Sequence, residues 1–280
     1  MRTIGFNTVK DTVCDLAIKA NTVLRPDVVL ALKKAYALER SVRAKKILRD
    51  IIENAAIAQA EQLAICQDTG IPVIFVEIGK DIIVSGKGMT EALQQGIRLG
   101  YQRGSLRNSI INDPLRVKKQ TSQFGPAMIH YDYNASHKLR ITVLPKGFGC
   151  ENKSQLKMFL PTATLGEIKA FIIDAVRTAG PDACPPYIIG VGIGGTADYA
   201  GFLAKKALLN KLKPQTANRK TTLANELLAE INKLNIGPMG LGGRTTALAV
   251  SVATHPTHIA GLPVAVNISC HALRSASALL

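Results

Sequence analysis

Three cysteines, each in a stretch marked by glycine or proline, are the residues of this sequence best suited to chemistry. Cys66 begins Cys-Gln-Asp-Thr-Gly, Cys184 lies in Ala-Cys-Pro-Pro, and Cys270 lies in Ile-Ser-Cys-His. Three thiolates can hold a 4Fe-4S cluster by three of its irons, which leaves the fourth iron open to a substrate. An iron without a protein ligand is a Lewis acid that can polarise a hydroxyl or a carboxylate.

The wide separation of these cysteines leaves two interpretations open. Either a folded scaffold brings them together, or each is an inert buried thiol, which is a common fate of cysteine. No two cysteines form a Cys-x-x-Cys pair, so the pattern disfavours a structural zinc site. Gln67 and Asp68 beside the first cysteine favour catalysis, because a carboxylate near a metal centre in a dry pocket can transfer a proton. Asp68 could instead simply cap its loop, as Asp-Thr-Gly usually does.

The composition is that of an ordinary globular protein, with 280 residues, 47% hydrophobic and 20% charged. No stretch has the roughly 18 uninterrupted apolar residues that a membrane helix needs. The N-terminus lacks the pattern of a signal peptide, so we expect a cytoplasmic protein with no membrane association. Five cysteines are too few and too uneven for a disulfide scaffold, which leaves the thiols available for metal binding.

The net charge of +15 raises the question of nucleic-acid binding. The chain has no tryptophan and only 5% aromatic residues, so it offers no platform on which bases could stack. We therefore expect no nucleic-acid partner. The basic residues are better explained as solvated helix faces, some of which attract a dianionic substrate or an acidic partner protein.

The hydrophobic pattern predicts an α/β fold with a helical N-terminal part, followed by mixed β-sheet layers packed with helices. We treat residues 1–280 as one domain, in which 1–64 is helical and 65–280 carries the three cysteines. The predicted strands and helices of the second part include a strand at 72–78, a helix at 89–103, a hairpin formed by 124–133 and 138–144, a strand at 187–191, a helix at 197–209, and strands at 247–252 and 263–268.

A glycine-rich turn follows the predicted strand at 187–191 and superficially resembles a dinucleotide-binding turn. Its glycines stand at 190, 192, 194 and 195, which is not the GxGxxG spacing. No acidic ribose partner occurs at 209–212. The turn therefore does not predict nucleotide binding, although its backbone N–H groups could face an anion or cluster sulfides.

Two histidines and one arginine could bind a dicarboxylate, which needs fixed cationic or N–H donors. His258 and His271 flank the strand that leads to Cys270, and each could equally be an ordinary surface residue. Arg107 is either a surface arginine or a clamp for a carboxylate. Local sequence does not decide between these roles.

Taken together, six segments resemble the α subunit of the iron–sulfur (class I) fumarate hydratase and L-tartrate dehydratase family. They are Cys66-Gln67-Asp68-Thr69-Gly70, Gly147–Ser154, Ala183–Tyr187, Val191–Thr196, Gly237–Gly243 and His255–Cys270. The segments span nearly the whole chain, which makes the match far more specific than any single motif. The resemblance implies the fold of the N-terminal domain of class I fumarases.

The resemblance also implies roles for eight residues. The 4Fe-4S cluster, whose fourth iron takes the substrate, would be held by Cys66, Cys184 and Cys270. Asp68 would take part in acid–base chemistry, and the substrate would be contacted by Gln67, Arg107, Gly149 and His258. Cys14 and Cys150 do not match ligand positions, so we interpret them as structural thiols.

The same resemblance implies a second polypeptide, because part of the family's active site lies on a further region or on a separate β subunit. We therefore expect an αβ heterodimer that pairs into α2β2. Residues 241–247 and 261–268 look more like two-subunit fumarases, which interconvert fumarate and L-malate in the tricarboxylic acid cycle, than like tartrate dehydratases. An L-tartrate dehydratase α subunit is the alternative. A further alternative, outside the enzymes, is a non-enzymatic iron–sulfur protein or a nucleic-acid-binding protein.

Overall fold

The computed structural model describes residues 2–111, 113–115, 124–212 and 222–280. These residues form two compact units, and each is built from segments that are distant in the sequence. The first unit contains Met1–Arg25, Ala55–Phe148 and Arg274–Leu280, and the second contains Pro26–Asn54 and Gly149–Leu273. Among the described helices, none combines the length and the apolar character needed to cross a membrane.

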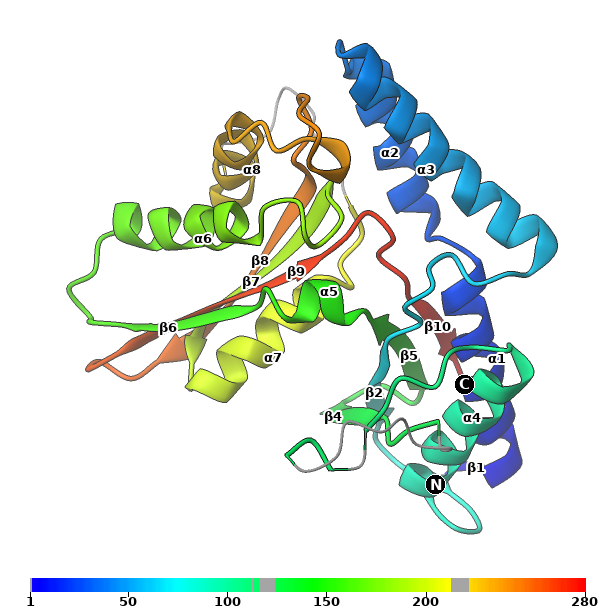
Figure 1. Cartoon of the computed structure of the whole chain (residues 1–280). Helices are drawn as coiled ribbons and strands as arrows, with labels where there is room; N and C mark the ends of the chain where they lie inside the picture. The colour runs from blue at the N-terminus through cyan, green and yellow to red at the C-terminus, as the bar shows by residue number, and fades with distance from the viewer. Residues whose placement is uncertain (1, 112, 116–123, 213–221) are drawn as a thin grey trace. The chain divides into compact units, whose positions relative to one another are not determined.

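The first unit is a four-stranded sheet with two long helices packed against it (Figure 1). The strand order is β10-β5-β2-β4. Strands β1 and β3 form a separate, short parallel pair. The elements are β1 (Arg2–Ile4), α1 (Phe6–Thr22), β2 (Ile71–Gly79), β3 (Ile82–Val84), α4 (Met89–Arg103), β4 (Met128–Asn134), β5 (Leu139–Lys146) and β10 (Ala276–Leu279).

Two glycines of α4 allow this helix to lie directly against α1. A Cβ atom at Gly96 would stand 2.6 Å from the carbonyl oxygen of Lys10, and one at Gly100 would stand 2.7 Å from that of Cys14. Real Cβ atoms do not approach backbone atoms this closely, so glycine is required at both positions. The helix pair in turn covers the buried strand residues of the sheet.

The predicted hairpin of 124–133 and 138–144 was wrong, although both strands exist. Strand β2 lies between β4 and β5, parallel to the first and antiparallel to the second. Phe75 of β2 faces His130 of β4 on one side and Thr142 of β5 on the other. A turn-like connection between two strands does not exclude an earlier strand that inserts between them.

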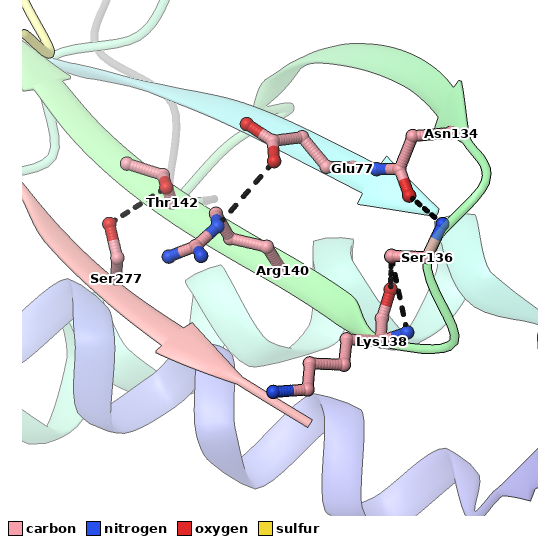
Figure 2. Close-up of polar contacts among 7 residues, drawn as sticks. All are labelled: Glu77, Asn134, Ser136, Lys138, Arg140, Thr142 and Ser277. Atoms are coloured by element: carbon pink, nitrogen blue, oxygen red, sulfur yellow. Dashed lines mark hydrogen bonds and ion pairs between the residues drawn. The ribbon is translucent and has the colours of Figure 1, made fainter. Parts of the chain in front are cut away.

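The connection between β4 and β5 therefore crosses the end of β2. Asn134 stabilises its first turn, since its Oδ1 accepts a hydrogen bond from Ser136 N at 2.8 Å (Figure 2). Gly79 N, at the end of β2, donates to Lys138 O at 3.0 Å. A Cβ atom at Gly79 would lie 2.5 Å from Ser136 O, so the connection can pass over β2 only at a glycine.

Side chains on this sheet also link its strands, as Figure 2 shows. Arg140 Nε of β5 lies 3.5 Å from Glu77 Oε2 of β2, and Thr142 Oγ1 of β5 lies 2.8 Å from Ser277 Oγ of β10. Both ends of the ion pair are substantially exposed to solvent, so it contributes little to stability. The buried apolar face is what holds this unit together.

The second unit is a four-stranded sheet with helices on both faces (Figure 1). Its strand order is β6-β9-β7-β8. Its elements are α2 (Pro26–Leu38), β6 (Gln155–Phe159), α6 (Leu165–Ala179), β7 (Tyr187–Gly195), α7 (Ala197–Ala207), α8 (Leu223–Lys233), a short 3-10 turn (Pro238–Gly240), β8 (Ala247–Thr257) and β9 (Leu262–Ser269). Two helices, α3 (Val42–Glu61) and α5 (Phe148–Glu151), begin in one unit and end in the other.

The glycines of β7 serve the packing of α7. Tyr187, Ile189 and Val191 alternate onto the face that α6 and α8 cover. On the opposite face, a Cβ atom at Gly190 would stand 2.0 Å from Ala204 O, and one at Gly192 would stand 2.1 Å from Ala200 O. These two glycines allow the backbone of α7 to lie against the strand. The packing of α7 therefore accounts for both glycines, and nucleotide binding is not needed to explain them.

A buried carboxylate joins the start of the second unit to its last glycine-rich turn. Glu39, which is 3% exposed, accepts hydrogen bonds from the backbone N–H groups of Arg40 and Ser41 at Oε1. Its Oε2 accepts a third from Arg244 N at 2.8 Å. Three donors satisfy a carboxylate that would otherwise be costly to bury. The contact holds the turn at 237–243, which in turn contacts the Cys184 loop.

The main prediction about the fold is confirmed. The N-terminal part is helical apart from β1, and mixed sheets packed with helices follow it. The predicted strands at 72–78, 187–191, 247–252 and 263–268 correspond to β2, β7, β8 and β9.

Candidate active site

The loop that carries Cys66 lies in the first unit, between α3 and β2. Its entry is fixed by Asn21 of α1, whose carbonyl oxygen accepts a hydrogen bond from Ile65 N at 2.9 Å. Its exit is fixed by Gly70, which has a φ of 71° and lies against the backbone of Lys146. A Cβ atom at Gly70 would lie 2.6 Å from Lys146 C, so the last residue of Cys-Gln-Asp-Thr-Gly must be glycine here.

Within this loop, two backbone N–H groups orient the carboxylate of Asp68. Oδ1 accepts from Gly70 N at 2.9 Å, and Oδ2 accepts from Phe148 N at 2.8 Å. The first bond is the local loop cap that Asp-Thr-Gly usually forms. The second comes from a distant segment and fixes the direction of the carboxylate, as a site for proton transfer requires.

Thr69 joins the same loop to Arg107. Thr69 Oγ1 donates to Arg107 O at 3.1 Å, so the backbone of Arg107 lies beside the loop while its side chain is exposed. The hydroxyl of Tyr101 lies beneath the loop and donates to the carbonyl oxygens of Thr69 at 2.9 Å and Gly70 at 3.2 Å. Gln67 is exposed. The first unit therefore brings together four predicted site residues: Cys66, Gln67, Asp68 and Arg107.

In the second unit, Cys184 and Cys270 lie at the same end of the sheet. Cys184 precedes β7 and Cys270 follows β9, and these strands run antiparallel with Ile188 opposite Ser269. His271 completes the link, because its N–H lies 3.4 Å and its Nδ1 lies 3.0 Å from Cys184 O. Here His271 positions the cysteine loops. Cys184 has a φ of 56°, which is uncommon for a residue other than glycine and is typical of functional sites.

Two further segments surround the Cys184 loop. Met239 N, in the glycine-rich turn, donates to Pro185 O at 2.8 Å. A Cβ atom at Gly149 would lie 3.9 Å from Asp182 O, so the predicted substrate-contacting glycine lies near this loop. Cys150 is buried and its Sγ donates to Ala183 O at 3.4 Å, which agrees with a structural role.

His258 lies away from these residues, at the opposite end of β9. It stands in the turn between β8 and β9, where its Nδ1 accepts from Ala260 N at 3.2 Å. The residues from Leu262 to Cys270 span roughly 26 Å at the rise of a β-strand. His258 therefore does not join Cys184 and Cys270 within the second unit.

Exposure divides the five cysteines into two groups. Cys14 and Cys150 are buried, whereas Cys66, Cys184 and Cys270 are partly exposed. Burial raises the pKa of the Cys14 thiol, which keeps it protonated and unsuited to metal binding. The three partly exposed cysteines are those that the sequence selects as ligands, and three accessible thiols fit the donor set of an iron–sulfur cluster.

These three donors are divided between the units, Cys66 in the first and the other two in the second. Throughout the described residues, no three histidine, cysteine or carboxylate side chains are grouped closely enough to hold a metal ion. The assignment of the ligands accordingly stays a prediction.

The structure adds two buried residues to the site that sequence reasoning did not select. Asn21 and Arg274 are buried and contact one another, with Arg274 Nη1 3.3 Å from Asn21 Oδ1, and the backbone of Asn21 binds the entry of the Cys66 loop. Asn21 lies near the end of a helix, and Arg274 lies in a stretch of mostly small residues close to the end of the chain. Neither position carries a sequence signal for function.

Comparisons with known proteins show the family to which the chain belongs. A protein of Methanocaldococcus jannaschii with the provisional name L(+)-tartrate dehydratase subunit alpha is 40% identical over 273 residues, or 96% of either chain. The L(+)-tartrate dehydratase subunit alpha of Escherichia coli K12 is 27% identical over 99% of this chain and 92% of its own. The same values hold for the subunit of that name from Shigella boydii. A family model described as Fumarate hydratase (Fumerase) matches residues 10–279. The chain therefore belongs to the fumarate hydratase (Fumerase) family of hydro-lyases.

Proposed function

We propose that this chain is the α subunit of an iron–sulfur hydro-lyase that reversibly hydrates fumarate to L-malate. One observation carries the proposal. Of five cysteines, the three that are partly exposed are those in Cys-Gln-Asp-Thr-Gly, Ala-Cys-Pro-Pro and Ile-Ser-Cys-His, and the first adjoins an oriented carboxylate. The family match over 10–279 and the subunit names of the relatives support it.

In this proposal Cys66, Cys184 and Cys270 hold a 4Fe-4S cluster. When bound, such a cluster supplies a Lewis acid for a hydroxyl and a carboxylate of the substrate. The protein groups that surround the thiols have a separate task, which is to bind the remaining carboxylate and to move protons. Arg107 offers a cation, Gln67 an amide, and Gly149 a backbone N–H.

Asp68 is the proposed proton-transfer residue of this chain. Its carboxylate would carry out one of the two proton transfers of the reaction, and the two N–H groups that hold it limit its movement during that step. A second proton-transfer residue and further cations would come from a β subunit. The α subunit alone is then inactive.

L-tartrate is the second candidate substrate, because relatives of this chain are named as tartrate dehydratase α subunits. Tartrate differs from malate by one additional hydroxyl, so the two reactions need the same chemistry and differ in the pocket. We favour fumarate because residues 241–247 and 261–268 look more like those of two-subunit fumarases.

An assay of the reconstituted protein tests this choice. The chain is combined anaerobically with a β-type subunit, iron and sulfide, and is then offered fumarate and L-tartrate separately. We expect malate to form at a rate at least roughly tenfold above tartrate turnover, since an unmatched hydroxyl in a pocket is discriminated against. Faster tartrate turnover would overturn the substrate. Salt-dependent DNA binding without either activity would overturn the enzyme class.

The position of His258 extends the proposal to the assembly. The side chain lies on an exposed turn beside Ile259, which is 89% exposed, at the end of β9 remote from Cys270. We therefore place His258 in the active site of a second copy of the chain within an α2β2 assembly. This follows the symmetric exchange of residues that closed oligomers permit.

A subunit-mixing experiment checks this placement. Asp68→Asn and His258→Ala chains are prepared separately, and both should be nearly inactive. Assembled together, they should regain about a quarter of wild-type activity, because half of the randomly mixed assemblies contain one site with both native residues. Activity that stays at the level of the separate variants would show that His258 acts within its own chain or not at all.

A further inference from the structure

The buried guanidinium of Arg274 is the feature of the first unit that the proposed mechanism leaves unused. Arg274 is 3% exposed, although arginine is almost never fully buried unless it is paired. Its Nη1 donates to Asn21 Oδ1 at 3.3 Å, and its Nε has no hydrogen-bond partner among the described residues. A buried cation held by one neutral amide needs a nearby negative charge.

The carboxylate of Asp68 lies close to this guanidinium, with Gly147 beside both. A Cβ atom at Gly147 would stand 3.3 Å from Asp68 Oδ2 and 3.5 Å from Arg274 Nη2. The two charged groups therefore border the same small space, which glycine leaves open. Oδ2 is also the oxygen that accepts from Phe148 N.

A buried tyrosine lies near the same pair of charges. Burial raises the pKa of Tyr101, and the charge of Arg274 opposes this rise while that of Asp68 adds to it. The Tyr101 hydroxyl remains a donor and holds the carbonyl oxygens of Thr69 and Gly70. The loop backbone and the two charged groups thus have Tyr101 as a common neighbour.

Asn21 completes this network. Its side-chain oxygen binds Arg274, and its backbone carbonyl binds Ile65 N immediately before Cys66. Asn21 is itself fully buried, and its amide donates to Ala17 O at 2.9 Å, which ties its side chain to α1. The segment after Cys270 and the loop of Cys66 are therefore joined through one helix residue.

We propose that Arg274 is a positioning residue, which holds the Asp68 carboxylate in its direction through charge and holds the Cys66 loop through Asn21. Its effect on catalysis rests on the proposed function, whereas its effect on the loop does not. A group positioned by a locked neighbour keeps the reacting geometry that an unsupported group loses. Arg274 acts here through Asp68 and has no assigned contact with the substrate.

Amide hydrogen exchange of the full chain without cluster tests the positioning directly. Replacement by Arg274→Gln removes the charge, and the N–H groups of Gly70 and Phe148 should then exchange at least about tenfold faster, because Asp68 no longer holds them. Arg274→Lys keeps the charge and should limit the change to about threefold. Arg103→Gln, at another arginine of the same unit, should change neither amide.

A merely structural role gives a different result. In that case Arg274→Gln would speed exchange at amides across the whole unit, including that of Val143 in the core of the sheet, and Arg274→Lys would not rescue it. This outcome would overturn the proposal. If Arg274→Gln fails to fold, Gly147→Ala places a methyl group beside both charged groups. It should speed exchange at Gly70 and Phe148 alone, and unchanged exchange there would likewise overturn it.

Kinetics of the protein reconstituted with its β subunit give the second readout. Arg274→Gln should lower kcat by at least about tenfold and leave KM within about threefold, because the Asp68 carboxylate loses its orientation while substrate binding is unchanged. The iron–sulfur absorption should stay the same. Arg274→Lys should recover most of kcat. Equal kcat in wild type and Arg274→Gln would refute the role in catalysis. A wild-type protein without hydratase activity would instead refute the proposed function and leave the exchange result valid.

Discussion

Serine in place of Cys66, Cys184 or Cys270 should abolish both the iron–sulfur absorption and the hydratase activity of the reconstituted αβ protein. We expect turnover to fall on the order of a thousandfold for each replacement, because a cluster held by three thiolates is lost or reshaped when one is missing. The structure gives a reason to expect this of these three cysteines, since they are the partly exposed ones.

The two buried cysteines provide the control for this experiment. Cys14→Ala and Cys150→Ala remove thiols that contact protein groups, and each should lower the free energy of unfolding by about 1 kcal/mol. Both should keep the absorption and most of the activity. Loss of the cluster in either control, or its retention in any one of the three serine variants, would contradict the assignment of ligands.

Asparagine in place of Asp68 should lower kcat by roughly a hundredfold to a thousandfold while the cluster absorption stays intact. The amide has nearly the shape of the carboxylate but cannot take up the proton. It also replaces one acceptor oxygen by an NH2 group, so it cannot accept from both Gly70 N and Phe148 N. Parallel measurement of kcat and of the absorption spectrum separates the loss of proton transfer from the loss of the cluster.

Asp182 is the matched control, since it lies close to Cys184 in the sequence as Asp68 lies close to Cys66. Its carboxylate forms an ion pair with Lys153 Nζ at 2.8 Å, and its side chain is largely exposed. Such a pair contributes little, so Asp182→Asn should keep activity within about threefold. A similar loss in both variants would indicate a general effect of charge near the cysteines and would remove Asp68 from its role.

The sequence predicted the parts of the fold that depend on local pattern. Helical periodicity and apolar runs identify the N-terminal helices and the strands β2, β7, β8 and β9, because each depends on residues close in the sequence. The pairing of β4 and β5 was mispredicted, since β2 comes much earlier in the chain and inserts between them.

The roles of the glycines also depend on contacts with residues that are distant in the sequence. A glycine-rich turn after a strand suggested an anion site, whereas Gly190 and Gly192 lie where the backbone of α7 touches β7. The requirement for glycine at these two positions becomes visible only when α7 is seen packed against β7. Gly70 could be interpreted from its motif, yet the reason that it must be glycine is the backbone of Lys146, distant in the sequence.

The candidate site divides in a similar way. Short motifs predicted Cys66, Gln67 and Asp68, whose neighbours in the sequence form the loop. Asn21 and Arg274 carry no such signal, because a buried polar residue and an exposed one look alike in a sequence. The distance of His258 from Cys270 was equally hidden, since the two lie close in the chain and at opposite ends of an extended strand.

Mössbauer spectroscopy of the αβ protein reconstituted with iron-57 tests the central claim most directly. We expect about four irons per αβ pair, of which one changes its isomer shift when malate or fumarate is added, because one iron has no thiolate and takes the substrate. The absence of bound iron would contradict the account, and so would four irons whose isomer shifts all stay unchanged when the substrate is added.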